Sequence, residues 1–260
     1  MCSVEGHLEI VTVEDAALMT CRWGRGAAGE PTIVLLHEGL GSITQWRDIP
    51  ELIHARTGLP VMAYDRGGYG RSSPAPAVYA TDFMHREARD VLPSVLASLG
   101  IDRPVLVGHS DGASIALIAA GEGTVSPLAV GAIAPHIHVE PVCIRGIRDI
   151  ATQRDQVVAG LARHHEHPEL VFDRWRDVWL SPGFASWDIS GYLPDIAVPV
   201  VAAQGDRDEY ATTAMIVGIT AEVPDSTGRI LPDCGHVAHR DQPELVLELV
   251  DEVVSRAVAA

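Results

Sequence analysis

A short apolar run that ends in a serine between two glycines constrains the fold of this chain most strongly. The segment Val105–Ala113 reads VLVGHSDGA, and a stretch with helical composition, residues 113–120, follows it at once. A strand that passes through Gly-x-Ser-x-Gly directly into a helix holds the serine in a strained turn, from which its hydroxyl projects off the sheet. Gly108 and Gly112 lie two residues to either side of Ser110, where a side chain would collide with neighbouring backbone. The pattern therefore predicts a nucleophilic serine, and it requires a base, an acid and oxyanion donors elsewhere in the chain.

Predicted strands alternate with predicted helices along most of the sequence. Continuous apolar runs, typical of strands covered on both faces, occupy residues 32–37, 60–64, 104–108, 128–134 and 198–204. Further strands are predicted at 7–13, 18–23 and 227–231, and helical spacing is found over 43–56, 81–99, 211–223 and 242–258. This alternation predicts an α/β fold, with a mostly parallel central sheet of about eight strands and helices on both faces.

One long segment interrupts the alternation. Residues 136–193 contain helical patterns rich in Arg, His and Trp but no convincing buried strand. Because this segment lies between two predicted core strands, we expect a helical cap inserted into a core formed by residues 1–135 and 194–260. At 260 residues and 47% hydrophobic composition, the chain is long enough to bury one sizeable core, so a single structural domain is expected.

Composition excludes several classes of partner. The net charge of −16 argues against binding to nucleic acid or to anionic membranes. No apolar run approaches membrane-spanning length, and residues 1–7 lack the pattern of a signal peptide. Cys2, Cys21, Cys143 and Cys234 are scattered without a C-x-x-C pair, as reduced thiols are in a cytosol. All 19 basic residues are arginine, which is typical of a GC-rich bacterial genome, and a cytoplasmic location is expected.

The base that a serine nucleophile needs is predicted in the loop after the last strand. A serine hydroxyl is a poor nucleophile at neutral pH and requires a base within hydrogen-bond reach. His236 follows a glycine in this loop, and such loops carry catalytic side chains in open α/β sheets. His239 lies three residues further on, and we expect it to be structural.

The acid that orients the base is expected between the serine and the histidine in the chain order Ser…Asp…His. Residues 205–209 read GDRDE and place three carboxylates after a predicted core strand. Spacing alone does not separate Asp206 from Asp208. Glu209 is expected to be solvated or to lie favourably at a helix N-terminus.

Two backbone N–H groups should stabilise the oxyanion. One is the N–H of Asp111, directly after the nucleophile, and the other is expected in the loop His37–Ser42, where glycines allow close approach of a ligand. A plain turn with Ser42 as a helix N-cap has the same composition, and Ser42 is suited to that role in either case.

Taken together and in this order, these motifs resemble the α/β-hydrolase superfamily. The resemblance covers roughly residues 31–259, and it rests on the segments Gly108–Gly112, His37–Gly41, Gly205–Asp208 and Gly235–His236. It implies an α/β-hydrolase fold with a lid at the position of the predicted cap. It also implies Asp208 as the acid and the N–H of Gly39 as the second oxyanion donor.

Two residues depart from the pattern of that superfamily. Many members have glycine where this chain has Glu38, and many have an apolar residue where it has Asp111. A carboxylate next to the nucleophile would oppose a developing oxyanion, so the Asp111 side chain should be turned away or paired. These departures bear on the substrate and leave the fold prediction unchanged.

Other motifs indicate neither a metal nor a cofactor. The run His164–His167 and the pair His136 and His138 lack zinc spacing, and we expect polar surface of the cap and rim of the pocket. The glycines of residues 67–70 lack the Lys-Ser/Thr ending of a phosphate loop.

The sequence therefore predicts a cofactor-independent serine hydrolase that cleaves a small carboxylic ester, thioester or lactone through an acyl-enzyme. Ser110, Asp208 and His236 form its predicted catalytic triad, and Gly39 and Asp111 its oxyanion hole. The resemblance keeps a C–C bond hydrolase or a cofactor-free haloperoxidase as alternatives that use the same residues. A ligand-binding protein on a hydrolase scaffold is a third alternative, which the complete triad disfavours.

Overall fold

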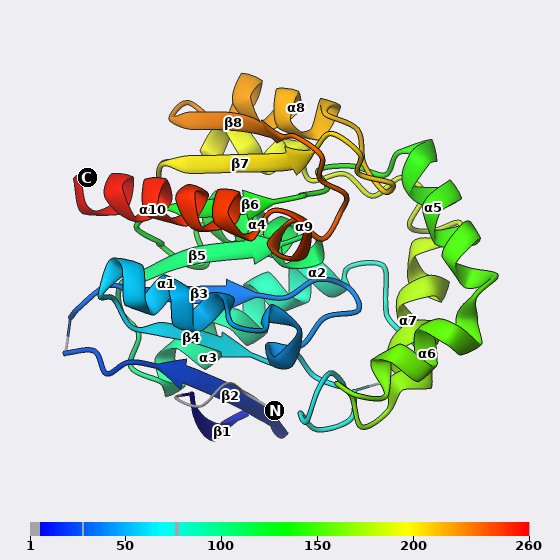
Figure 1. The fold of residues 1–260 in the computed structure, drawn as a ribbon, viewed down its shortest axis with the longest axis horizontal. Helices are drawn as coiled ribbons and strands as arrows, with labels where there is room; N and C mark the ends of the chain where they lie inside the picture. Colours follow the sequence, from blue (N-terminus) through cyan, green and yellow to red (C-terminus); the bar gives the residue numbers. More distant parts are fainter. Residues whose placement is uncertain (1–5, 28, 76–77, 260) are drawn as a thin grey trace.

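An eight-stranded sheet forms the centre of the molecule, shown in Figure 1. The computed structural model describes residues 6–27, 29–75 and 78–259. The strands are β1 (His7–Val13), β2 (Ala16–Trp23), β3 (Thr32–Leu36), β4 (Val61–Tyr64), β5 (Pro104–His109), β6 (Val130–Ile133), β7 (Val200–Gly205) and β8 (Ser226–Leu231). Their order in the sheet is β1-β2-β4-β3-β5-β6-β7-β8, in which β2 pairs antiparallel with β1 and β4, and all other neighbours run parallel. The predicted fold class is confirmed.

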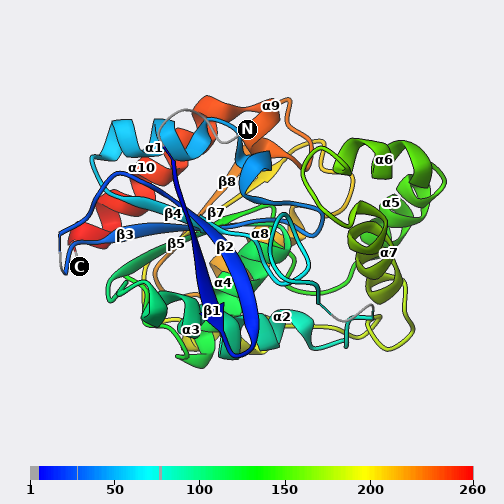
Figure 2. The same ribbon diagram turned by 90° about the horizontal axis from the view of Figure 1, so that it is seen from below.

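Helices cover both faces of the sheet, which explains the continuous apolar runs. Every residue of β3, β4, β5, β6 and β7 is buried. Helices α1 (Ile49–Thr57) and α10 (Pro243–Ala259) lie on one face, and α3 (Leu92–Ser98), α4 (Asp111–Glu122) and α8 (Ala214–Glu222) on the other (Figure 2). Alternate residues of one strand join different cores: Ile33 packs on the side of α10, and Val34 on the side of α4.

Two of the predicted helices have a different form in the structure. The prediction of one helix over residues 43–56 is wrong, because a 3-10 turn η1 (Ile43–Trp46) ends at Arg47 in a left-handed conformation (φ +56°) before α1 begins. The predicted helix at 81–99 is continuous but changes its winding, from α2 (Phe83–Arg86) through a π-helical turn η2 (Glu87–Val91) to α3. Pro93 lies in the first turn of α3, where a proline is tolerated.

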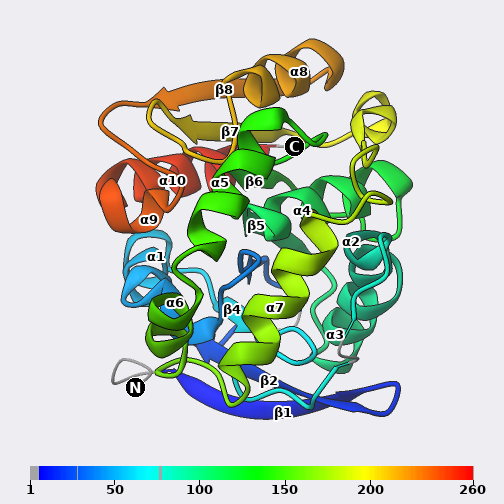
Figure 3. The ribbon, with the colours of Figure 1, turned by 90° about the vertical axis from the view of Figure 1, so that its right-hand side faces the viewer.

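The inserted segment, residues 136–193, stands beyond the carboxyl ends of the parallel strands (Figures 1 and 3). It carries helices α5 (Pro141–Ala151), α6 (Arg154–Leu161) and α7 (Pro168–Trp179), and the 3-10 helix η3 (Ser190–Asp195) leads out of it towards β7. A β-bridge between His138 and Asp188 joins its two ends. Its aromatic side chains Trp179, Phe184 and Trp187 are buried.

Within the described residues, no helix combines the length and apolar character needed to cross a bilayer. The side chains of Cys21, Cys143 and Cys234 are buried. Cys2 and most of the N-terminal segment on which the signal-peptide prediction rests lie outside the described residues.

Candidate active site

Ser110 occupies the sharp turn between β5 and α4. Its backbone is left-handed in φ (φ +53°, ψ −119°), a conformation that non-glycine residues rarely adopt and that marks strain. A Cβ added to Gly108 would lie 2.2 Å from the carbonyl oxygen of Gly112, and one added to Gly112 would lie 2.1 Å from that of Leu36. Both glycines are therefore required by the close approach of backbone, as the sequence predicts.

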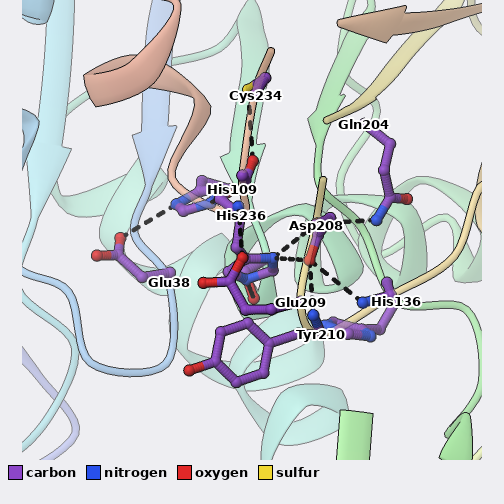
Figure 4. Close-up of polar contacts among 12 residues, drawn as sticks. Glu38, His109, His136, Gln204, Asp208, Glu209, Tyr210, Cys234 and His236 are labelled. Atoms are coloured by element: carbon purple, nitrogen blue, oxygen red, sulfur yellow. Dashed lines mark hydrogen bonds and ion pairs between the residues drawn. The ribbon is translucent and has the colours of Figure 1, made fainter. Parts of the chain in front are cut away.

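The structure brings the three predicted triad residues together. Ser110 Oγ lies 2.9 Å from His236 Nε2, and His236 Nδ1 lies 3.0 and 2.9 Å from the two carboxylate oxygens of Asp208. The Nδ1–H of His236 donates to Asp208, as Figure 4 shows, which leaves Nε2 to accept from the serine hydroxyl. These residues follow β5, β7 and β8, whose carboxyl ends meet at one edge of the sheet.

Hydrogen bonds to the charged form keep the Asp208 carboxylate ionised. It accepts from the backbone N–H groups of Tyr210 (2.8 Å) and Ala211 (3.2 Å) and from the side chain of Gln204 (2.8 Å). Burial raises the pKa of Asp208, but His236 and these N–H groups outweigh that effect and lower it to about 2. Burial also lowers the pKa of His236, and the adjacent Asp208 outweighs it, so that this pKa lies above its ordinary value of 6.5.

The other two carboxylates of the same loop also bond to the histidine loop. Asp206 accepts from the N–H of Cys234 at 3.1 Å, and Glu209 accepts from the N–H of His236 at 3.2 Å. Of the two aspartates left open by spacing, Asp208 is therefore the one in contact with the imidazole. The side chain of Glu209 is exposed to solvent, as expected, and it also binds the main chain of the histidine. Spacing alone does not distinguish these three roles, and only the resemblance to the superfamily points to Asp208 as the acid.

The loop that follows β3 is fixed by hydrogen bonds to its carbonyl groups. The carbonyl of Glu38 accepts from Arg66 Nη2 and from His37 Nδ1, each at 2.8 Å. The Tyr69 hydroxyl donates to the carbonyl of Gly39 at 3.0 Å. These hydrogen bonds hold the carbonyl groups of Glu38 and Gly39. Two buried side chains, Arg66 and Tyr69, therefore fix the orientation of the peptide groups on both sides of Gly39.

Gly39 and Asp111 are neighbours in space, as an oxyanion hole requires. A Cβ added to Gly39 would lie 3.0 Å from Asp111 Oδ2 and 2.4 Å from Trp175 Nε1 of α7. Asp111 is the first residue of α4, so its N–H has no acceptor within the helix. Through its Trp175, the inserted segment thus covers Gly39.

The Asp111 side chain is buried without a hydrogen bond. It is 1% exposed, and neither of its carboxylate oxygens has a hydrogen-bond partner among the described residues. Its nearest compensating charge is Arg66, whose Nη2 lies 3.8 Å from Oδ2, so the expected pairing takes the form of a buried ion pair. Burial raises the pKa of Asp111 to about 6 against the opposing charges of Arg66 and His236.

The remaining histidines near the site have packing or bridging contacts. His239 is buried against Trp46, with ring centroids 4.9 Å apart, and burial lowers its pKa to about 4. His165 accepts from the N–H of Gly70 at 2.9 Å, which ties the inserted segment to the core. Within the part of the chain that the structure describes, no three His, Cys, Asp or Glu side chains form a group that could hold a metal ion.

Comparison with known proteins places this architecture in a family. The sequence model of the alpha/beta hydrolase family matches residues 33–249. Serine hydrolase BPHL of Homo sapiens is 25% identical over 69% of this chain, which spans only 64% of the length of BPHL. The 2-hydroxy-6-oxo-6-phenylhexa-2,4-dienoate hydrolase of Burkholderia cepacia is 23% identical over 88% of this chain and 90% of its own. The crystal structure of the enol-lactonase from Burkholderia xenovorans LB400 has the same fold, with a TM-score of 0.74, 17% identity and coverage of 95% of this chain and all of that one. The chain therefore belongs to the alpha/beta hydrolase family.

Proposed function

We propose that this protein is a serine hydrolase that cleaves a small carboxylic ester, thioester or lactone through an acyl-enzyme. The observation that carries the proposal is the unbroken chain of hydrogen bonds from Ser110 Oγ through His236 to Asp208. In this geometry a base is in contact with the nucleophile and an ionised acid is in contact with the base, which is the arrangement that activates a serine.

In the proposed mechanism, Ser110 Oγ attacks the substrate carbonyl carbon while His236 Nε2 accepts the hydroxyl proton. Asp208 holds the Nδ1–H tautomer and stabilises the imidazolium that forms. The N–H groups of Gly39 and Asp111 bind the oxyanion of the tetrahedral intermediate. His236 then donates its proton to the leaving oxygen or sulfur and activates a water molecule, which releases the acyl group from Ser110.

A surface groove lies beside the loop that carries Asp208, and no triad residue lines it. It has a volume of about 580 Å³, and it is lined by α5, α6 and the pair Glu209 and Tyr210. The ring of Tyr210 separates this groove from His236, with the two ring centroids 4.9 Å apart. We propose that residues 136–193 act as a cap over the site.

The proposal is tested by hydrolysis of a short p-nitrophenyl ester by the parent protein and by Ser110→Ala. We expect the variant to fold like the parent and to lose hydrolysis, together with covalent labelling by a fluorophosphonate. A variant that turns over the ester at the parent rate would refute Ser110 as the nucleophile. A parent protein that neither reacts with the fluorophosphonate nor hydrolyses any substrate would support a ligand-binding role.

The type of bond that the protein cleaves is determined with a panel of substrates, because the similar proteins are named for different substrates. A dienoate and an enol-lactone appear in the names of two of them. The panel therefore contains an ester, a thioester, a lactone and a vinylogous diketone, each assayed with the parent and with Ser110→Ala. A preference for the vinylogous diketone would favour a C–C bond hydrolase, which is the second candidate.

A further inference from the structure

Two residues that precede the proposed machinery in sequence face each other in the structure. Glu38 comes directly before Gly39, and His109 comes directly before Ser110. Glu38 Oε2 lies 3.4 Å from His109 Nδ1 (Figure 4). The His109 side chain is fully buried and that of Glu38 is 14% exposed, so the contact is shielded from water.

The other nitrogen of the same ring holds the main chain of the proposed base. His109 Nε2 lies 2.7 Å from the carbonyl oxygen of His236. A carbonyl oxygen only accepts, so Nε2 carries a hydrogen and donates it. The N–H of His236 is bound by Glu209 at 3.2 Å, and both sides of this residue's main chain are therefore held by side chains.

Donor and acceptor assignment indicates the charge on His109. With a hydrogen on Nε2, a neutral ring would present the lone pair of Nδ1 to the Glu38 carboxylate, which is a repulsive contact. A second hydrogen on Nδ1 makes the same contact an ion pair. Burial raises the pKa of Glu38, but His109, His239 and His37 outweigh it and hold this pKa well below its usual range, so the group that faces Nδ1 is an ionised carboxylate.

We propose that His109 is a positioning residue, an imidazolium held by Glu38 that fixes the carbonyl of the catalytic histidine His236. This inference rests on the proposed function. A hydrogen bond from a charged donor is roughly twice as strong as a neutral one, so ionisation of His109 tightens the attachment of the histidine loop to the nucleophile turn. Glu38, which departs from the superfamily pattern, thereby has a defined role beside the oxyanion loop.

Three other aromatic rings surround His109. His109 also faces the rings of His236 and His239, each with a centroid distance of 5.2 Å, and Trp46 at 6.4 Å. Burial lowers the pKa of His239 to about 4, so this neighbour is neutral at neutral pH and does not compete with His109 for the Glu38 carboxylate.

The first test compares His109→Leu and Glu38→Gln with the parent protein in hydrolysis of a p-nitrophenyl ester. In His109→Leu we expect kcat to fall about 10- to 100-fold, with KM within about twofold, because misplacement of a base by a fraction of an ångström slows proton transfer without weakening binding. Labelling of Ser110 by a fluorophosphonate should slow by the same factor. In Glu38→Gln an amide N–H can donate to Nδ1 of a neutral ring whose Nε2–H still reaches His236, so kcat should fall less than in His109→Leu.

A matched control removes a similar bond far from the site. His54 on α1 is half-buried and its Nδ1 lies 2.7 Å from the carbonyl oxygen of Leu59. His54→Leu should therefore leave kcat within about twofold of the parent. Should His109→Leu not fold, His109→Gln keeps an N–H donor in the same place, and it is expected to retain more activity than any folded variant without a donor at residue 109.

Nuclear magnetic resonance supplies readouts that do not depend on turnover. With ¹⁵N-labelled histidine, His109 should show hydrogens on both ring nitrogens in the parent and on Nε2 alone in Glu38→Gln. The low-field proton of the His236 Nδ1–H···Asp208 bond should broaden in His109→Leu through faster exchange with water. A neutral His109 in the parent, or an unchanged resonance together with an unchanged kcat in His109→Leu, would overturn the inference. Because these spectra report the geometry of His236 and Asp208, they distinguish this failure from a failure of the proposed reaction at Ser110.

Discussion

The buried carboxylate of Asp111 should make the stability of this protein depend on pH in a defined way. Its pKa is raised from the ordinary value of 3.8 to about 6, first by burial, with Arg66 and His236 opposing. A raised pKa means that the folded state binds the proton more tightly than the unfolded state. The contribution of this group to stability is therefore most favourable below pH 4, and it is lost as the pH rises through 6.

The size of the effect follows from the two pKa values. A difference of this size between the folded and unfolded states corresponds to about 3 kcal/mol in the free energy of unfolding. The loss is near zero below pH 4 and is complete above about pH 7. In Asp111→Asn the side chain is neutral at every pH and has the same shape. The free energy of unfolding of this variant minus that of the parent should therefore rise by about 3 kcal/mol between pH 4 and pH 7. This holds whatever the absolute stability of the variant.

Urea denaturation followed by tryptophan fluorescence, repeated at intervals across that range, measures this difference. The control is Asp102→Asn, which removes a carboxylate that is exposed to water. It measures how far the removal of an exposed carboxylate alone changes the free energy of unfolding at each pH. A constant difference for Asp111→Asn would show that folding leaves the pKa of Asp111 at its ordinary value. A difference that moves in favour of the parent as pH rises would show that Arg66 more than compensates the cost of burial.

Three further predictions concern the proposed reaction. Asp208→Asn should lower kcat for ester hydrolysis by about 10³- to 10⁴-fold, as loss of the triad acid does. Asp206→Asn should lower kcat less than tenfold. If the two variants ranked in the reverse order, Asp206 and not Asp208 would be the acid. Because catalysis needs neutral His236, and Asp208 raises the pKa of His236, a plot of kcat/KM against pH should fall on the acid side with an inflection above 6.5. An inflection below 6.5 in the parent would contradict that coupling. Gly39→Ala should lower kcat at least tenfold, since its Cβ would lie 2.4 Å from Trp175 Nε1 and must displace the loop or the indole. An unchanged kcat would contradict the tight packing of Trp175 against Gly39 on which this prediction rests.

The layered α/β fold was predictable because its strands are buried on both faces. Residues 33–36 and 104–108 are apolar throughout, and such runs are typical of parallel strands that helices cover on both sides. The break after Trp46 was not predictable in the same way, because apolar spacing continues across it. There the left-handed conformation of Arg47 and the proline in the first turn of α1 decide where the helix begins. Apolar periodicity carries no information on such backbone angles.

In the candidate site, too, some residues were predictable from the sequence and others were not. Ser110 and His236 were predictable because a strained turn needs glycines at fixed spacing and because each residue follows a strand directly. The ion pair of Glu38 with His109 was not, since its members are 71 residues apart and meet only through the pairing of β3 with β5. The partner of Asp111 depends in the same way on Arg66, which the loop after β4 brings beneath the α4 N-terminus.

Sequence spacing does not identify which carboxylate contacts the imidazole of His236, whereas the structure does. Strands β7 and β8 are parallel neighbours in register from Val200 with Ser226 to Gly205 with Leu231, so the loops that follow them leave the sheet side by side. Each carboxylate of the first loop meets a different donor of the second: an N–H of Cys234, the imidazole of His236, or its N–H. All three carboxylates therefore bind the loop that follows β8. Each of them also satisfies a sequence pattern that requires an acid after β7. Only the direction of the side chain, set by the turn after Gly205, assigns the imidazole to one carboxylate and the main chain to the other two.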